Sequence, residues 1–329
     1  MVKIVGHRAF KGSCPENSLK AFNMAYDNGV DMLETDLQLT KDGEIIINHD
    51  SDTGRNWDQD LVIAESNYED LLKLKHKLLP DEKILTFNDL LTWFIGRIDQ
   101  DDTPHDCKLM LDIKFTNDKL ILVKIFNEML KVRDDLQFWQ SRIVLGVWLL
   151  DWYQYGVETA VFKGFDIIVI TMSLDVAEQF INYSIKLDDP DFKLYGISIH
   201  YVSSWTDNFR YVLCPIIEKY DIKVFLWTVN KEIDFSYIEG LPIYGTITDN
   251  PLDARAYLKD KHHWATTTDE KHKFNVPQLN SLEGLRFHSY IVIYDVVCAL
   301  LFSKWAHFKI FGYSVAYIIF LMLRVIHFL

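Results

Sequence analysis

The stretch Met32-Leu33-Glu34-Thr35-Asp36-Leu37-Gln38 is apolar and strand-like, but two acids interrupt it. Side chains alternate across a strand, so Glu34 and Asp36 point to the same side. Unpaired carboxylates are too costly to bury in a dry core. The pair therefore needs a cation, a Lys or Arg partner, or a water-filled pocket, and the stretch predicts a buried strand that carries a polar site.

Length, charge and cysteine content limit the classes of protein that fit. The chain has 329 residues, of which 49% are hydrophobic, enough for one large domain or two ordinary ones. The net charge of −13 argues against nucleic acid as the main partner. Four scattered cysteines without a C-x-x-C pair indicate a reducing compartment, with neither a zinc site nor a disulfide framework. A strand-like run begins at Lys3, so we expect no signal peptide.

Strand-like and helix-like segments alternate along the chain, which favours an α/β fold with a parallel sheet. Strands are predicted near residues 3–6, 31–38, 44–49, 109–114, 143–148, 167–171, 196–200, 223–229 and 244–248. Helices are predicted over residues 17–28, 66–77, 86–97, 118–132, 152–162, 176–185, 206–220 and 252–259.

One of these strands cannot belong to a parallel barrel. The turn Asp42-Gly43 is too short for a parallel crossover, so residues 44–49 must fold back as an antiparallel hairpin on residues 31–38. This pairing brings His49 near Asp36. Removing the hairpin strand leaves eight βα units over about 255 residues, the usual size of a TIM (β/α)8 barrel. Residues 51–108 exceed one helix and predict a small insertion after the hairpin.

The active site of such a barrel lies at the C-terminal ends of its strands. Strands four to six offer only Trp148, Ser173 and His200, and His200 is as compatible with a core position as with lipid contact. The polar groups of the other strand ends are His7, Arg8, Glu34, Asp36, His49, Asp50, Asp112, Lys114, Trp227, Thr228, Asn230, Thr248 and Asp249.

These residue types favour metal-dependent cleavage of a phosphodiester. Oxygen ligands from three carboxylates suit one divalent cation, Mg²⁺ or Ca²⁺. Imidazoles serve as general acid and base near neutral pH, and fixed cations bind phosphate oxygens. The alternatives are that the acids form ion pairs without a metal, and that Trp227 fills the barrel rather than contacting substrate. The predicted ligands are Glu34, Asp36 and Asp112, the acid and base are His7 and His49, and the phosphate-binding cations are Arg8 and Lys114.

Seven short motifs resemble the glycerophosphodiester phosphodiesterase family. They are His7-Arg8-Ala9, Pro15-Glu16-Asn17-Ser18, Glu34-Thr35-Asp36, His49-Asp50, Asp112-Ile113-Lys114, Trp227-Thr228-Val229-Asn230 and Thr248-Asp249-Asn250-Pro251. The resemblance implies a TIM barrel, one divalent metal and two catalytic histidines. It also implies supporting roles for Glu16, Asn17 and Asp50, with Glu16 close to the metal. Three departures are Ala9 for the usual Gly, Asp112 for the usual Glu and Ser18 for the usual Thr.

More narrowly, the chain is similar to the fungal phosphatidylglycerol-specific phospholipases C, through residues 49–55, 149–153, 202–206 and the tail from Gly284. This resemblance implies cleavage of phosphatidylglycerol to diacylglycerol and glycerol 3-phosphate, through attack of the head-group 2-hydroxyl and a cyclic phosphate. It implies a lipid droplet, endoplasmic reticulum or mitochondrial membrane as the location. The alternatives are a glycerophosphodiester phosphodiesterase or lysophospholipase D acting on other head groups, and a non-catalytic lipid-binding barrel.

The C-terminal part differs in composition from the barrel. We expect a catalytic domain over residues 1–259, a polar linker over 260–283 and a hydrophobic anchor over 284–329. The anchor region has two apolar runs, Tyr290–Phe302 and Ile310–Leu329, and carries four Lys or Arg residues against one acid. Basic and aromatic flanks suit an anionic membrane surface. We expect a helical hairpin in the membrane, with a single span or a pair of helices packed on the barrel as alternatives.

Overall fold

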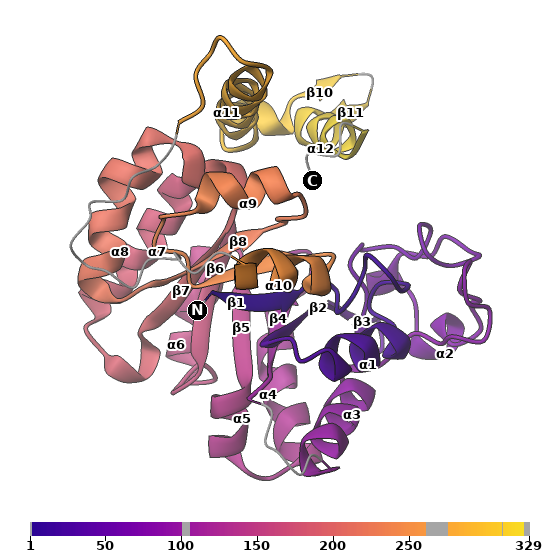
Figure 1. The fold of residues 1–329 in the computed structure, drawn as a ribbon. Helices are drawn as coiled ribbons and strands as arrows, with labels where there is room; N and C mark the ends of the chain where they lie inside the picture. Colours follow the sequence, from indigo (N-terminus) through magenta and orange to yellow (C-terminus); the bar gives the residue numbers. More distant parts are fainter. Residues whose placement is uncertain (1, 101–105, 261–275, 311, 326–329) are drawn as a thin grey trace.

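The computed structural model describes residues 2–100, 106–260, 276–310 and 312–325 (Figure 1). Its main sheet has nine strands in the order β1-β9-β8-β7-β6-β5-β4-β2-β3, and pairing of β1 with β2 closes it into a barrel. All barrel pairings are parallel, whereas β3 is antiparallel to β2. The strands are β1 (Lys3–Gly6), β2 (Met32–Leu39), β3 (Ile45–Ile47), β4 (Lys108–Ile113), β5 (Ile143–Val147), β6 (Asp166–Thr171), β7 (Leu194–His200), β8 (Lys223–Trp227) and β9 (Gly245–Thr248).

This architecture confirms the predicted TIM barrel and its hairpin. Leu37 pairs with Ile47 across the hairpin, and the backbone N–H of Asn48 donates to the carbonyl of Asp36 at 3.2 Å. His49, which follows Asn48, therefore lies beside the C-terminal half of β2, as the Asp42-Gly43 turn predicted.

Helices surround the barrel, and three of them begin at a capping side chain. Ser18, Asp135 and Ser173 each accept a backbone N–H at a helix start. The helix that Asp135 caps was not predicted, because it is only seven residues long and follows closely on its predecessor. The helices of the barrel are α1 (Leu19–Asp27), α3 (Phe87–Gln100), α4 (Leu120–Val132), α5 (Leu136–Arg142), α6 (Leu150–Glu158), α7 (Leu174–Leu187), α8 (Cys214–Tyr220), α9 (Glu232–Ile238) and α10 (Pro251–Asp260).

The apolar residues form two layers. Alternate side chains of the strands fill the barrel interior, and their neighbours pack outward against the helices. The interior layer consists of Val5, Met32, Met110, Val144, Ile168, Ile170, Phe225 and Ile247. The carboxylates of β2 and β4 share this inward face, because Met32 and Met110 stand two positions before Glu34 and Asp112.

The insertion after β3 has a small core of its own, built on Trp57 and Leu74. A helix was predicted over residues 66–77, but α2 spans only Tyr68–Leu71. The prediction was wrong beyond Leu71 because the backbone there bonds to another segment: Lys77 N–H donates to the Asn56 carbonyl at 2.9 Å. Tertiary pairing therefore replaces the local helical bonds that the apolar spacing suggested.

The C-terminal region contains α11 (Leu282–Leu301), a short 3₁₀ turn (Lys304–His307), the two-residue strands β10 (Lys309–Ile310) and β11 (Tyr313–Ser314), and α12 (Val315–Val325). Figure 1 shows α11 and α12 together on one side of the barrel, where Arg286 of α11 pairs with Asp234 of α9. Among the described residues, α11 is the one helix long and apolar enough to cross a membrane. It starts eight residues before the predicted apolar run, and most of the predicted linker lies outside the described residues.

Candidate active site

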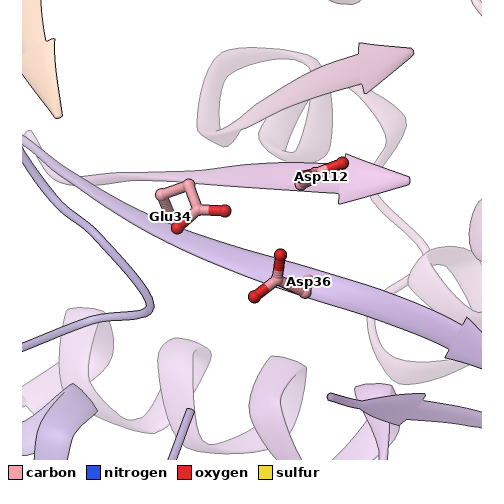
Figure 2. A group of neighbouring side chains, drawn as sticks. All are labelled: Glu34, Asp36 and Asp112. Carbon is pink, nitrogen blue, oxygen red and sulfur yellow. The ribbon is translucent and has the colours of Figure 1, made fainter. Parts of the chain in front are cut away.

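Three carboxylates meet at the C-terminal end of neighbouring strands. Glu34 and Asp36 lie on β2, and Asp112 lies on β4 directly opposite Asp36 in the register. All three are buried, and each offers an oxygen within 4.8 Å of the others (Figure 2). The structure thus brings together the three predicted metal ligands.

Cations neutralise this cluster only in part. The Lys114 ammonium lies 2.7 Å from Asp36 Oδ1 and 2.5 Å from Asp112 Oδ2, and Arg8 Nε lies 3.7 Å from Asp36 Oδ2. Glu34 accepts the backbone N–H of Arg8 at 2.7 Å, and among the described residues no Lys or Arg forms an ion pair with it. Negative charge therefore remains uncompensated at Glu34.

The electrostatics of the cluster fit a divalent cation. Burial, together with the charges of Asp36 and Asp112, raises the pKa of Glu34 well above its usual range. Burial and the Asp36 charge also raise the pKa of Asp112, whereas Lys114 overcomes burial and lowers the pKa of Asp36. Closely spaced oxygen donors with surplus negative charge are the donor set of Mg²⁺ or Ca²⁺. The residues therefore fit the predicted metal.

The turn after β1 donates two backbone hydrogen bonds to Glu34. Arg8 and Ala9 have φ values of 47° and 67°, in the left-handed region. This conformation costs about 1–3 kcal/mol per non-glycine residue and persists only where its surroundings fix it. Here the Arg8 N–H reaches the Glu34 carboxylate, and the Ala9 N–H donates to the Glu34 carbonyl at 3.0 Å. The buried Ala9 methyl is accommodated, so replacement of the usual glycine is compatible with the site.

Each predicted catalytic histidine is held by a carboxylate. His7 Nδ1 lies 2.6 Å from Asp249 Oδ1, and His49 Nδ1 lies 2.8 Å from Asp50 Oδ1. Burial raises the pKa of Asp249, but the hydrogen bond from His7 outweighs this and lowers it to about 2. An ionised carboxylate can only accept, so Nδ1 of each ring carries the proton and Nε2 is left for acid–base chemistry.

The protonation of the two imidazoles is also set by burial. Burial lowers the pKa of His7, and the Arg8 charge adds to this effect. Burial, followed by the charges of Lys114 and Arg8, lowers the pKa of His49 to about 3. Both rings are thus neutral near pH 7, which makes either one competent to accept a proton from a substrate hydroxyl.

The predicted supporting residues take distinct positions. Asn17 Nδ2 donates to Asp36 Oδ2 at 2.9 Å. Glu16 pairs with Arg8 at 3.0 Å and with Arg55 at 2.6 Å. It is therefore bound by two arginines and is not part of the carboxylate cluster. Arg55 also lies 2.5 Å from Asp50 and so links Glu16 to the residue that holds His49.

Sequence reasoning assigned no role to four residues that the site uses: Arg55, Trp148, Asn230 and Asp249. Asn230 Nδ2 donates to Asp249 Oδ2 at 2.8 Å, so both residues position His7. The signal for them was present, because they follow the C-terminal ends of β8 and β9, and β9 pairs with β1. Trp148 also stands at a strand end, but its contact with Asp112 is made between strands and has no local signal. Arg55 lies in the insertion and carried no such signal.

Two tryptophan rings, at the C-terminal ends of β5 and β8, lie near the cluster. The half-buried Trp227 lies 6.4 Å from Trp148 and 5.3 Å from His200 between ring centroids. His200 itself is buried and packs on Tyr201 at 4.8 Å, a core position. Trp227 therefore lines the mouth between the acidic cluster and the apolar side of the barrel.

Comparisons with known proteins agree with this geometry. Residues 7–253 match the glycerophosphoryl diester phosphodiesterase family. The chain is 24% identical to a lysophospholipase D of Mus musculus over 78% of this chain and 86% of that protein. It is 42% identical to a Bacillus altitudinis glycerophosphodiester phosphodiesterase, but that match spans only 22% of this chain and 29% of the relative.

Solved structures share the fold. A phosphodiesterase of Oleispira antarctica in complex with the product sn-glycerol-3-phosphate has a TM-score of 0.62 and 18% identity, and the match covers 78% of this chain and 96% of that one. The corresponding values for a glycerophosphoryl diester phosphodiesterase of Silicibacter pomeroyi are 0.63, 17%, 79% and 94%. With the family match spanning more than half of the sequence, this chain belongs to the glycerophosphoryl diester phosphodiesterase family and is a phosphoric diester hydrolase.

Proposed function

We propose that this protein is a metal-dependent phosphodiesterase for glycerophospho-esters, including single-chain phospholipids, that releases the head-group alcohol as a lysophospholipase D does. The observation that carries the proposal is the buried, undercompensated cluster of Glu34, Asp36 and Asp112 between two carboxylate-held histidines. Similarity to the lysophospholipase D of Mus musculus supports the same substrate class.

The site residues have separate tasks in this reaction. A divalent cation held by the three carboxylates would supply a Lewis acid for the phosphate oxygens. Arg8 Nε is buried and has no hydrogen-bond partner among the described residues, so it is a donor available to the phosphate. Lys114 uses two of its three N–H groups on Asp36 and Asp112, which leaves one for the substrate.

The two imidazoles move the protons. One takes the proton of the glycerol hydroxyl that neighbours the phosphodiester, and this oxygen bonds to phosphorus. When the anionic phosphodiester binds, the other imidazole takes up a proton from solvent at Nε2. It gives this proton to the leaving alcohol as the bond from phosphorus to that alcohol breaks. Water then opens the cyclic phosphate, with the same two groups in exchanged roles. Asp249 and Asp50 keep His7 and His49 oriented throughout.

A second candidate is the phospholipase C reaction on phosphatidylglycerol, in which the head-group 2-hydroxyl attacks and diacylglycerol leaves. The observation in its favour is the apolar C-terminal surface, because a two-chain lipid does not leave its bilayer. The exposed large residues of this surface include Val292, Val296, Phe302, Trp305, Phe308, Ile310, Tyr313, Tyr317, Leu321 and Met322. This surface and the exposed Lys304 and Lys309 suit an anionic lipid surface, of a lipid droplet, the endoplasmic reticulum or a mitochondrion.

The contacts of α11 favour attachment in the plane of the surface. Arg286 pairs with Asp234 of α9 at 2.6 Å, and the Tyr294 hydroxyl donates to the Met172 carbonyl at 2.7 Å. Phe287 stacks on Trp205 with 4.9 Å between ring centroids. A helix that crosses a bilayer would break these contacts. Of the three arrangements expected from sequence, these contacts therefore support a pair of helices packed on the barrel better than a hairpin in the membrane or a single span.

One assay separates the candidates. Purified full-length protein in detergent is incubated with lysophosphatidylcholine, glycerophosphocholine or phosphatidylglycerol, with and without EDTA, and the products are identified by mass spectrometry. Metal-dependent release of choline from the first two supports the leading proposal. Diacylglycerol from phosphatidylglycerol alone supports the second candidate, and no turnover of any substrate contradicts both.

A further inference from the structure

Each carboxylate of the cluster accepts one hydrogen bond from a neutral N–H group. Glu34 accepts from the Arg8 backbone, Asp36 accepts from the Asn17 amide, and Asp112 Oδ1 accepts from the Trp148 indole at 2.7 Å. The first two donors belong to the segment after β1. The third donor, Trp148, follows β5, a strand end for which the sequence predicted no catalytic or metal-binding residue.

Packing fixes the orientation of the Trp148 indole. Its ring meets Phe115 edge-on at 5.9 Å and Trp227 at 6.4 Å between centroids. The Lys114 ammonium lies 5.7 Å from the centroid of the same ring. With neighbours of three kinds around it, the ring has little freedom to turn its N–H away from Asp112.

Asp112 needs such a restraint more than its partners do. Its other oxygen lies 2.5 Å from Lys114 Nζ, and Lys114 is shared with Asp36 at 2.7 Å. A flexible ammonium shared between two carboxylates cannot fix the rotation of either one. An indole N–H only donates, so it engages Oδ1 while leaving further lone pairs of the carboxylate for a cation.

We propose that Trp148 is a positioning residue that holds Asp112 in the rotamer required for binding the divalent cation. The inference rests on the proposed metal-dependent function. Hydrogen-bond partners of metal ligands typically contribute about 10–100-fold to metal affinity. Trp148→Phe removes the N–H but retains a ring against Phe115, Trp227 and Lys114.

The test is calorimetric titration of EDTA-stripped full-length protein with Mg²⁺, and separately with Ca²⁺. Trp205→Phe is the matched control, because its indole N–H is also buried without a hydrogen-bond partner among the described residues, and its ring packs against Phe287 of α11 rather than in the site. We expect Trp148→Phe to weaken binding of the preferred cation by about 10–100-fold. Trp205→Phe should bind as the wild type does. Circular dichroism in EDTA checks that both variants fold.

Combination with Asp112→Asn distinguishes positioning from general loosening of the site. If Trp148 acts through the Asp112 carboxylate, Trp148→Phe adds no further loss of affinity in the Asp112→Asn background. Wild-type affinity in Trp148→Phe, or equal losses in both tryptophan variants, would overturn the inference and leave the proposed function standing. A wild-type protein that binds neither cation would overturn the proposed function as well.

Discussion

His7 Nδ1 and Asp249 Oδ1 lie 2.6 Å apart, although 242 positions separate the two residues in the chain. Closure of the barrel makes this contact, because Gly6 of β1 pairs with Thr248 of β9. Gly6 immediately precedes His7, and Thr248 immediately precedes Asp249. The first and last strands of the barrel thus jointly position one histidine–aspartate dyad of the candidate site.

Asp249→Asn tests this dyad. The amide has the same size but no charge, so it no longer favours the His7 tautomer with a proton on Nδ1. We expect kcat to fall by about 10²–10⁴-fold, the usual contribution of a positioned acid–base group. Asp253→Asn, an equivalent change at an exposed position of α10, is the control. Equal kcat values for the two variants in a phosphodiesterase assay would contradict a role for Asp249.

Glu34→Gln tests whether the charge of Glu34 destabilises the fold in the absence of a divalent cation. Burial and the neighbouring acids raise the pKa of Glu34, so its charge opposes folding when no cation is bound. In EDTA, we expect the variant to have a higher free energy of unfolding than the wild type, because the amide removes a charge that burial and the neighbouring acids disfavour. Divalent cations should raise the melting temperature of the wild type but not that of the variant. A variant less stable than the wild type in EDTA would show that the cluster is not under charge repulsion.

Glu16 makes stability depend on acid pH. Burial raises its pKa, but the hydrogen bonds from Arg55 and the charge of Arg8 prevail and lower it from 4.5 to about 2. A lowered carboxyl pKa stabilises the fold above the unfolded-state value of 4.5, and this contribution disappears as the pH falls toward 2. The shift corresponds to at most about 3 kcal/mol.

The measurement compares urea unfolding of the wild type and Glu16→Gln. The variant should be less stable near pH 7, and the difference should shrink as the pH falls to about 3. A difference that does not change with pH would mean that Glu16 contributes through packing rather than through its charge.

Phe287→Ala tests the docking of α11. Phe287 is 1% exposed and stacks on Trp205, so its truncation should cost about 3–5 kcal/mol locally and release the helix from the barrel. Limited proteolysis should then cut the C-terminal region faster. Leu285→Ala changes a residue on the same helix that is 57% exposed, and should have little effect. Equal cleavage of the two variants would show that α11 is not held by this contact.

The sequence predicted the barrel because its signals were local. Buried strands are continuous apolar runs, and Asp42-Gly43 identified the hairpin that brings His49 to the cluster. The three carboxylates of the cluster were predictable because they lie toward the C-terminal ends of their strands, where a barrel of this class has its active site. Glu34 and Asp36 share a face by the period of the strand alone, which needs no tertiary information.

Contacts made across the fold escaped prediction. Arg55 comes from the insertion, whose path depends on pairing with residues 75–77, and that pairing also replaced the predicted helix beyond Leu71. Trp148 was recognised at the end of an apolar strand, but its hydrogen bond to Asp112 joins two strands and has no local signal. The docking of α11 depends on the ion pair of Arg286 with Asp234 and on stacking with Trp205, which apolar composition could not reveal.

The central claim is that Glu34, Asp36 and Asp112 hold a cation required for phosphodiester cleavage. Its most direct test is the turnover of lysophosphatidylcholine by EDTA-treated protein before and after addition of Mg²⁺ or Ca²⁺, with Asp36→Asn in parallel. We predict no turnover in EDTA, recovery of the wild type with a cation, and no recovery of the variant. Undiminished turnover by the wild type in EDTA, or by Asp36→Asn, would contradict the claim.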